Sequence, residues 1–189
     1  MKQGKLLVFS APSGSGKTTF VRHLLQQDLP LGFSISATSR APRGKEEEGK
    51  DYYFLSPEAF EEKINTGAFL EYEEVYAGTY YGTLKTEVER LWQNDLHVLF
   101  DIDVKGGLRI KEQYPGQTLA LFIQPPSKAA LEKRLRGRGT EDEEAIEMRL
   151  SRAEEELSFA PQFDTVIIND DLELAKKQVV QKVKRFMGL

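Results

Sequence analysis

Short apolar runs alternate along this chain with segments whose apolar residues recur at helical spacing. Four runs have the length and the aliphatic content of strands buried on both faces of a sheet, at residues 6–9, 96–100, 119–123 and 165–168. Helices are predicted from Lys17 to about residue 27, over 84–94, on both sides of residues 137–140, and in a closing segment around Val179 and Val183. This alternation is typical of an α/β protein with a parallel sheet.

The interval from about 34 to 84 departs from this alternation. It contains strand-like pieces at 33–36, 51–55, 69–76 and 79–83, and one helix that is predicted to begin after an N-cap at Ser56 and a first-turn proline at Pro57. A run of short strands interrupts the strand–helix order expected of a parallel sheet. We therefore expect an inserted lobe that binds a substrate on the main sheet.

Composition narrows the class of protein. The chain has 189 residues and is 40% hydrophobic, which is enough for one sizeable core, and its formal net charge of −4 argues against a nucleic-acid or membrane partner. With no cysteine and only two histidines, neither disulfides nor a thiolate or histidine metal site is expected. No apolar run of 18 residues and no signal-like segment are found, so we expect a soluble cytoplasmic protein. The sequence does not indicate an oligomeric state.

The residues between the first strand and the first helix form a candidate phosphate-binding loop, called the phosphate loop below. They follow the pattern G-x-x-x-x-G-K-[ST] with alanine in place of the first glycine, and they are Ala11, Pro12, Ser13, Gly14, Ser15, Gly16, Lys17, Thr18 and Thr19. In such a loop, backbone N–H groups and the helix N-terminus converge on phosphate oxygens. We expect Lys17 to reach the β and γ phosphates and the Thr18 hydroxyl to bind Mg²⁺. Alanine at position 11 requires a negative φ there, and the alternative reading is an ordinary glycine-rich turn.

Two arginines on either side of Pro42 form a second candidate phosphate site. The proline stiffens the turn, so that the guanidinium groups of Arg40 and Arg43 can be held on one side of a loop. The alternative, which this motif alone favours, is a solvated basic turn that answers the acidic run at residues 46–48.

Further charged side chains lie at the end of a strand and in the last third of the chain. Asp101 and Asp103 follow the strand at 96–100, where an acid linked to Mg²⁺ or to a substrate would stand, or where one of them could cap the next helix. Arg134, Arg138 and Arg149 cluster around the glycine break at 137–140. Most charges there should be solvated, but these three could form a flap over a bound nucleotide.

Together these motifs resemble the guanylate kinase family over essentially the whole chain. The resemblance rests on the phosphate loop, on Ser36, Arg40 and Arg43 with their spacing, and on Gly49-Lys50-Asp51-Tyr52, Glu71, Tyr80-Tyr81-Gly82-Thr83, Asp101-Ile102-Asp103, Gly137-Arg138-Gly139-Thr140 and Asn169-Asp170-Asp171. It implies the P-loop NTPase fold of nucleoside monophosphate kinases, with a five-stranded parallel core sheet. The core would comprise residues 1–33, 84–124 and 159–189, the GMP-binding lobe 34–83 and the lid 125–158.

The resemblance also implies the reaction and the roles of individual residues. The family transfers the γ-phosphoryl group of ATP to GMP, and by the same resemblance to dGMP, with Mg²⁺. Lys17, Arg134, Arg138 and Arg149 would be catalytic, Arg138 and Asn169 would join the phosphate loop in binding ATP, and the GMP site would consist of Ser36, Arg40, Arg43, Tyr52, Glu71, Tyr81, Thr83, Asp101 and Asp103. Guanine presents adjacent N1–H and N2–H donors that one carboxylate can accept, and Glu71 suits this role.

Three alternatives remain at this stage. Glu71 could be an exposed strand carboxylate like Glu73 and Glu74. The chain could phosphorylate another phosphorylated acceptor on the same scaffold. It could also be an interaction module that binds a phosphorylated partner through Arg40, Arg43 and Tyr52 without turnover, although such a module has no physical need for Lys17 and Thr18.

Overall fold

The computed structural model describes residues 3–137 and 143–189, and its centre is a five-stranded sheet in which neighbouring strands run parallel. The strands follow the order β2-β7-β1-β8-β9. Their bounds are Leu31–Phe33 for β2, His97–Asp101 for β7, Leu6–Ser10 for β1, Thr118–Gln124 for β8 and Thr165–Ile168 for β9. The α/β fold with a five-stranded parallel core is therefore confirmed, and the four predicted apolar runs supply four of its strands.

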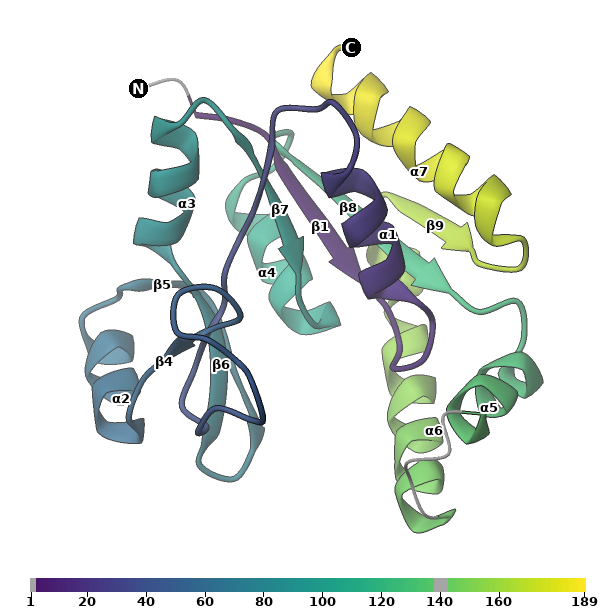
Figure 1. Ribbon diagram of the computed structural model, residues 1–189, viewed down its shortest axis with the longest axis horizontal. Helices are drawn as coiled ribbons and strands as arrows, with labels where there is room; N and C mark the ends of the chain where they lie inside the picture. The colour runs from purple at the N-terminus through teal and green to yellow at the C-terminus, as the bar shows by residue number, and fades with distance from the viewer. Residues whose placement is uncertain (1–2, 138–142) are drawn as a thin grey trace.

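Helices cover both faces of this sheet, so its strands are buried on both faces (Figure 1). In β1, Leu7 and Phe9 pack in one core cluster with α1 (Lys17–Leu25) and α7 (Leu172–Met187). Leu6 and Val8 belong to a second cluster with α3 (Lys85–Gln93) and α4 (Val104–Gln113). An apolar run without alternation suits this two-sided environment. The carboxyl ends of β1 and β7 lie at the same end of the sheet, called its carboxyl edge below, and the rest of the molecule is attached there.

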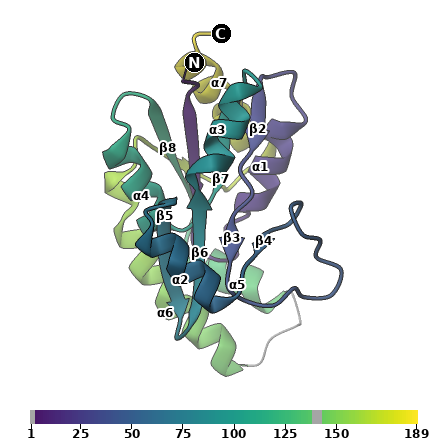
Figure 2. The ribbon, with the colours of Figure 1, turned by 90° about the vertical axis from the view of Figure 1, so that its left-hand side faces the viewer.

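A second sheet forms the predicted lobe on that edge (Figure 2). Its strand order is β4-β3-β6-β5, with β4 at Tyr53–Phe54, β3 at Ala37–Thr38, β6 at Thr79–Leu84 and β5 at Phe69–Tyr76. The helix α2 (Pro57–Asn65) packs Phe60 against Phe69 and Tyr80, with ring centroids 4.3 and 5.4 Å apart. Its start is as predicted, because the Ser56 Oγ accepts the backbone N–H of Ala59 at 3.2 Å.

The predicted strand over 33–36 is wrong. Phe33 ends β2 in the core sheet and Ala37 begins β3 in the lobe sheet, so residues 34–36 cross from one sheet to the other. The backbone N–H of Ser34 still donates to the carbonyl of Leu99, whereas that of Ile35 donates to the side chain of Glu87. The alternating apolar and polar residues here therefore end one strand and form a connection between two sheets, not one continuous strand.

A buried carboxylate from the core joins this crossing segment to the lobe. Glu87 in α3 accepts hydrogen bonds from the Ile35 backbone N–H at 3.1 Å and from the Tyr53 hydroxyl at 3.0 Å. Arg90 donates to the same carboxylate through Nε and Nη2, both at 2.8 Å. Burial by itself raises the pKa of Glu87, but these hydrogen bonds outweigh it and hold the pKa below its ordinary value.

Two helices project from the other side of the same edge, α5 (Lys128–Arg136) and α6 (Glu143–Ser158), followed by the 3-10 turn η1 (Ala160–Gln162) (Figure 1). They pack together through Leu131, Leu135 and Ala153. Gly137 closes α5, whereas Arg138, Gly139 and Thr140 of the predicted glycine break lie outside the described residues. In the part of the chain that the structure describes, no helix has both the length and the apolarity needed to cross a bilayer.

Candidate active site

A cavity of about 740 Å³ opens between the core sheet, the lobe and α6. Its lining brings together residues that are far apart in the sequence: the phosphate loop, the acidic end of β7, one side of the lobe and one face of α6. Parallel strands and their following loops commonly form a binding crevice at this edge of an α/β sheet.

The phosphate loop connects β1 directly to α1. Gly14 and Gly16 have φ angles of +88° and +92°, which L side chains rarely adopt, and Gly16 is the N-cap of α1. Ala11 is buried and keeps a negative φ, as the sequence required, since Asp95 is the one non-glycine residue with a positive φ among those described. The loop therefore has the conformation that its glycines predict, with alanine accommodated at its first position.

Lys17 lies at the junction of the loop with the acidic end of β7. Its Nζ is 2.7 Å from Oδ1 of Asp101 and donates to the carbonyl of Ile102 at 2.9 Å. These oxygens hold the ammonium group at the cavity, where phosphate oxygens could replace them. Thr18 is exposed at the same place and lines the cavity.

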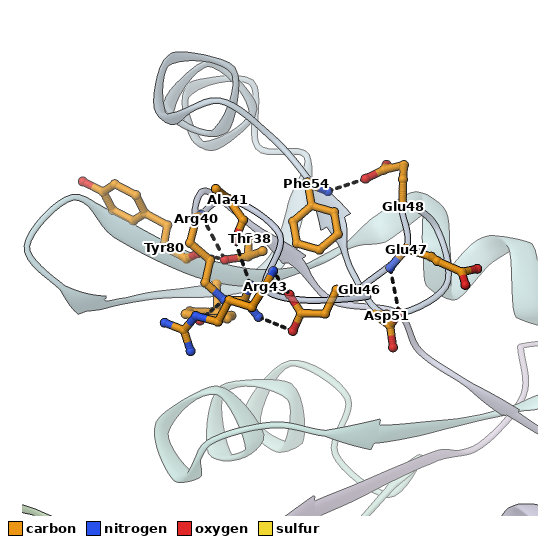
Figure 3. Close-up of polar contacts among 11 residues, drawn as sticks. Thr38, Arg40, Ala41, Arg43, Glu46, Glu47, Glu48, Asp51, Phe54 and Tyr80 are labelled. Carbon is orange, nitrogen blue, oxygen red and sulfur yellow. Dashed lines mark hydrogen bonds and ion pairs between the residues drawn. The ribbon is translucent and has the colours of Figure 1, made fainter. Parts of the chain in front are cut away.

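Arg40 is held by three side chains of the lobe, and Figure 3 shows the one from Glu46. Its Nη1 and Nη2 lie 2.6 and 2.8 Å from the two carboxylate oxygens of Glu46, its Nε donates to the Tyr81 hydroxyl at 2.9 Å, and its guanidinium lies 4.8 Å from the centroid of the Tyr52 ring. The hydrogen bond from Arg40, followed by one from the Arg43 backbone, lowers the pKa of Glu46 to about 2. The side chain of Arg43 lines the cavity with Tyr52 and Tyr81.

The sequence analysis did not single out Glu46 as a site residue. The alternative there was a solvated basic turn that answers the acidic run at 46–48; the pairing of Arg40 with Glu46 is confirmed, but the Arg40 side chain is only 10% exposed. The pair does not exclude a phosphate site, because a bidentate carboxylate fixes the guanidinium plane beside Tyr52 and Tyr81, which line the cavity, although Arg40 itself is not part of the lining. The available signal was the short separation between Arg43 and Glu46 after a stiffening proline.

Glu71 is a buried carboxylate, not an exposed strand residue. Its side chain is on β5, the residue is 5% exposed, and its Oε1 accepts a hydrogen bond from the Thr83 hydroxyl at 2.6 Å. Burial raises the pKa of Glu71 to about 7, and the negative charge of Asp103 adds to this, while the hydrogen bond from Thr83 and the charge of Arg109 oppose it. Glu71 lines the cavity together with Ser36 and Tyr81.

Asp101 and Asp103 have different partners. Asp101 pairs with Lys17, as described above, whereas Asp103 caps α4 by accepting the backbone N–H groups of Lys105 and Gly106 at 2.8 and 2.9 Å. The helix-cap alternative is therefore correct for Asp103. Because Asp103 also lines the cavity, its cap bonds fix the carboxylate at the position where a ligand would meet it.

The arginines of the last third of the chain separate into two groups. Arg149 lines the cavity and donates from Nη1 to the Ser13 hydroxyl at 2.9 Å. Arg134 is not part of the lining: its Nη2 donates to the carbonyl of Asn169, and the Asn169 amide donates in turn to the carbonyl of Ser15, both at 2.8 Å. Arg134 is therefore linked through Asn169 to the backbone of the phosphate loop. Arg138 lies outside the described residues.

Two further residues of α6 face the cavity and were missed by the sequence analysis. Arg152 and Glu156 line it beside Arg149, and their side chains are paired at 3.3 Å. Burial raises the pKa of Glu156, opposed by the charges of Arg152 and Lys17. Arg152 follows Arg149 by three residues and Glu156 follows Arg152 by four, a spacing that places all three on one helix face and is the signal that the sequence contained.

The oxygen donors near Lys17 are compatible with Mg²⁺. Thr18 offers a hydroxyl and Asp101 a carboxylate, and in residues 3–137 and 143–189 no cluster of three or more histidine, cysteine, aspartate or glutamate residues could cage a metal. Mg²⁺ is commonly held in this way, by one or two protein oxygens together with water and substrate phosphates. The donor set therefore fits magnesium bound mainly through a nucleotide.

The chain is similar to known proteins both in sequence and in structure. Residues 3–187 match the family model described as "Guanylate kinase". The chain is 55% identical to a guanylate kinase of Bacteroides thetaiotaomicron over 98% of this chain and 91% of the relative, and 50% identical to one of Porphyromonas gingivalis over 97% and 98%. The crystal structure of guanylate kinase from Anaplasma phagocytophilum superposes with a TM-score of 0.73 at 30% identity and covers 98% of this chain and 87% of that one.

Proposed function

This chain belongs to the guanylate kinase family, and we propose that its cavity aligns ATP and GMP for phosphoryl transfer. The reaction is the transfer of the γ-phosphoryl group of ATP to GMP, which gives ADP and GDP. One observation carries the assignment of residues: Lys17 of the phosphate loop lines the same cavity as Arg43 and Glu71 of the lobe. Phosphoryl transfer depends on such alignment and on charge compensation, and needs no nucleophilic side chain.

We assign the ATP side to the phosphate loop and to α6. The backbone N–H groups of residues 11–19 bind the phosphates, and Lys17 leaves Asp101 to contact the β and γ phosphates. Arg149 is already bonded to Ser13 of the loop, so it can stabilise the charge of the transferred group with little movement. Arg138 and Asn169 stay in this assignment, as an ATP contact and as a support of the loop near the adenine.

Mg²⁺ belongs to this side of the site. The Thr18 hydroxyl would hold it, with Asp101 as a second oxygen donor nearby once Lys17 has turned to the phosphates, and the ion would neutralise negative charge on the β and γ phosphate groups.

We assign the GMP side to the lobe and to the acidic end of β7. Arg40, Arg43, Tyr52 and Tyr81 bind the phosphate of GMP, and the ion pair with Glu46 keeps Arg40 pointed at it. Ser36, Glu71, Thr83 and Asp103 surround the guanine. Glu71, already oriented by Thr83, accepts the N1–H and N2–H donors of guanine.

The domain division follows the same assignment. Residues 34–83 form the GMP-binding lobe, 125–158 the lid, and 1–33, 84–124 and 159–189 the core. The proposal includes dGMP as a second acceptor and a cytoplasmic location, where both nucleotides occur.

The decisive experiment measures ADP release with ATP, Mg²⁺ and each nucleoside monophosphate in turn. We expect turnover with GMP and dGMP far above that with AMP, CMP or UMP. Lys17→Ala should lower kcat by about a hundredfold or more, since it removes the cation nearest the transferred group, while thermal unfolding stays unchanged. Normal turnover of this variant would show that the loop is misassigned. A wild-type protein without turnover on any acceptor would favour the phosphorylated-partner module instead.

A further inference from the structure

The carboxylate of Glu71 is confined on both of its oxygens. Its Oε1 is bonded to the Thr83 hydroxyl at 2.6 Å, as described above. Its Oε2 faces the first turn of α4, where a methyl group added at Gly106 would lie only 2.5 Å from Oε2 and 3.2 Å from the carboxyl carbon. A carbon–oxygen contact of 2.5 Å does not occur between unbonded atoms, and 3.2 Å to the carboxyl carbon is tighter than most such contacts. The space that Oε2 occupies therefore exists because residue 106 has no side chain.

Conformation does not explain a glycine at this position. Gly106 lies inside α4 and is not among the residues with a positive φ. A glycine in a helix costs about 1 kcal/mol relative to alanine, so the helix by itself would favour alanine here. The steric contact with Glu71 is what alanine would violate.

The next residue provides an internal comparison. A methyl group at Gly107 would point to the core sheet, 2.7 Å from Cγ1 of Val8 and 2.9 Å from Oγ of Ser10. The two glycines share a helix, a burial class and a propensity, and they differ in what their missing side chains leave room for. Gly107 makes room for the core, and Gly106 makes room for the carboxylate.

We propose that Gly106 is a positioning residue for base selection, because its missing side chain lets α4 hold the Glu71 carboxylate in the plane that faces guanine. This inference rests on the proposed role of Glu71 as the acceptor of the guanine N–H groups. A methyl group at 106 pushes the carboxylate away from α4. Thr83 already contacts the other oxygen closely, so the group must rotate or move out of its plane, and its two oxygens then no longer match two adjacent donors.

The test compares Gly106→Ala with Gly107→Ala in the full-length protein. Gly106→Ala should raise the KM for GMP by roughly tenfold to a hundredfold, as expected for an ångström-scale displacement of a binding group, and should narrow the ratio of kcat/KM for GMP to that for AMP. The KM for ATP should stay the same. Gly107→Ala should leave the ratio unchanged whatever it does to thermal stability. Equal effects of the two variants on this ratio, or no effect of Gly106→Ala, would overturn the proposal.

A double-mutant cycle shows whether Gly106 acts through Glu71. In a Glu71→Ala background no carboxylate is left to displace, so adding Gly106→Ala should cause no further change in kcat/KM for GMP. A further loss in that background would mean that residue 106 acts by another route, and would refute the proposal. If Glu71→Ala alone leaves GMP use unaffected, the assigned role of Glu71 itself has failed, which is a separate outcome.

Discussion

Two buried glutamates, Glu71 on β5 of the lobe and Glu87 on α3 of the core, differ in the hydrogen bonds that their carboxylates accept. Glu87 is 2% exposed and accepts hydrogen bonds from Ile35, Tyr53 and twice from Arg90. Glu71 is 5% exposed and receives its hydrogen bond from Thr83. The pKa of Glu87 lies below its ordinary value, whereas that of Glu71 is raised to about 7.

Under the proposed assignment, the difference separates a carboxylate that joins the core to the lobe from one that would meet the guanine. Burying a charge is unfavourable unless donors surround it, and the protein supplies those donors at Glu87. At Glu71 it leaves acceptor capacity unused at the wall of a cavity. The two N–H donors of guanine can supply there what Arg90 supplies to Glu87, so binding energy is reserved for the correct base.

The largest effect is expected when Glu71 is replaced by glutamine. The amide presents an NH₂ group to the guanine donors, so Glu71→Gln should lower kcat/KM for GMP by a factor that corresponds to roughly 2–5 kcal/mol, while the KM for ATP changes little. The ratio of kcat/KM for GMP to that for AMP should narrow, because the carboxylate also repels the unprotonated N1 of adenine. Measuring both substrates under identical Mg²⁺ and salt tests this, and an unchanged ratio would remove Glu71 from base recognition.

The matching substitution at Glu87 should reverse the pattern. Glu87→Gln leaves the Arg90 guanidinium facing an uncharged amide and one donor without an acceptor, at a cost of about 1–3 kcal/mol in the free energy of unfolding. The GMP to AMP ratio should stay as in the wild type. Urea unfolding measures the loss of stability, and the same kinetic assay measures the ratio of kcat/KM for GMP to that for AMP. Loss of base selectivity without loss of stability would contradict the division of roles between the two glutamates.

The raised pKa of Glu71 predicts that GMP binding depends on pH. Guanine requires the ionised carboxylate, and a pKa of about 7 means that the ionised fraction rises about tenfold between pH 6 and pH 8. The KM for GMP should therefore fall by about that factor as pH rises. The phosphate of GMP also titrates near pH 6, so Glu71→Gln serves as the control that reports the phosphate alone. Identical pH profiles for the two proteins would count against a neutral Glu71 at pH 6.

The smallest effect is expected at Glu46, which is far more accessible than either buried glutamate. Glu46→Gln weakens the ion pair that orients Arg40, and a partly exposed pair of this kind should change KM for GMP by about two- to fivefold. Tyr81 and the Tyr52 ring continue to hold the guanidinium. Glu47→Gln, in the same acidic run but paired with Lys50, is the matched control and should have no effect on KM. A loss at Glu46 as large as that at Glu71 would make Glu46 a direct binding residue.

The sequence by itself determined the features that arise from local interactions. The phosphate loop depends on glycines at fixed positions between a strand and a helix, and α2 begins where Ser56 and Pro57 predict. The core strands are apolar runs that any parallel sheet would bury. Arg40 and Arg43 were singled out by the proline between them and Glu71 by the resemblance, although their contacts were not predictable.

Only the tertiary structure decided which side chains meet. It ended the core strand at Phe33 and made residues 34–36 a crossing segment, joined Arg40 to Glu46, linked Arg134 through Asn169 to the phosphate loop, and placed α4 against Glu71. Apart from the short separation between Arg43 and Glu46, no period or spacing marks these contacts in the sequence. Residues 71 and 106 are far apart along the chain, and their contact exists because β5 and α4 pack together, so the reason for a glycine at position 106 lies in the fold rather than in the helix that contains it.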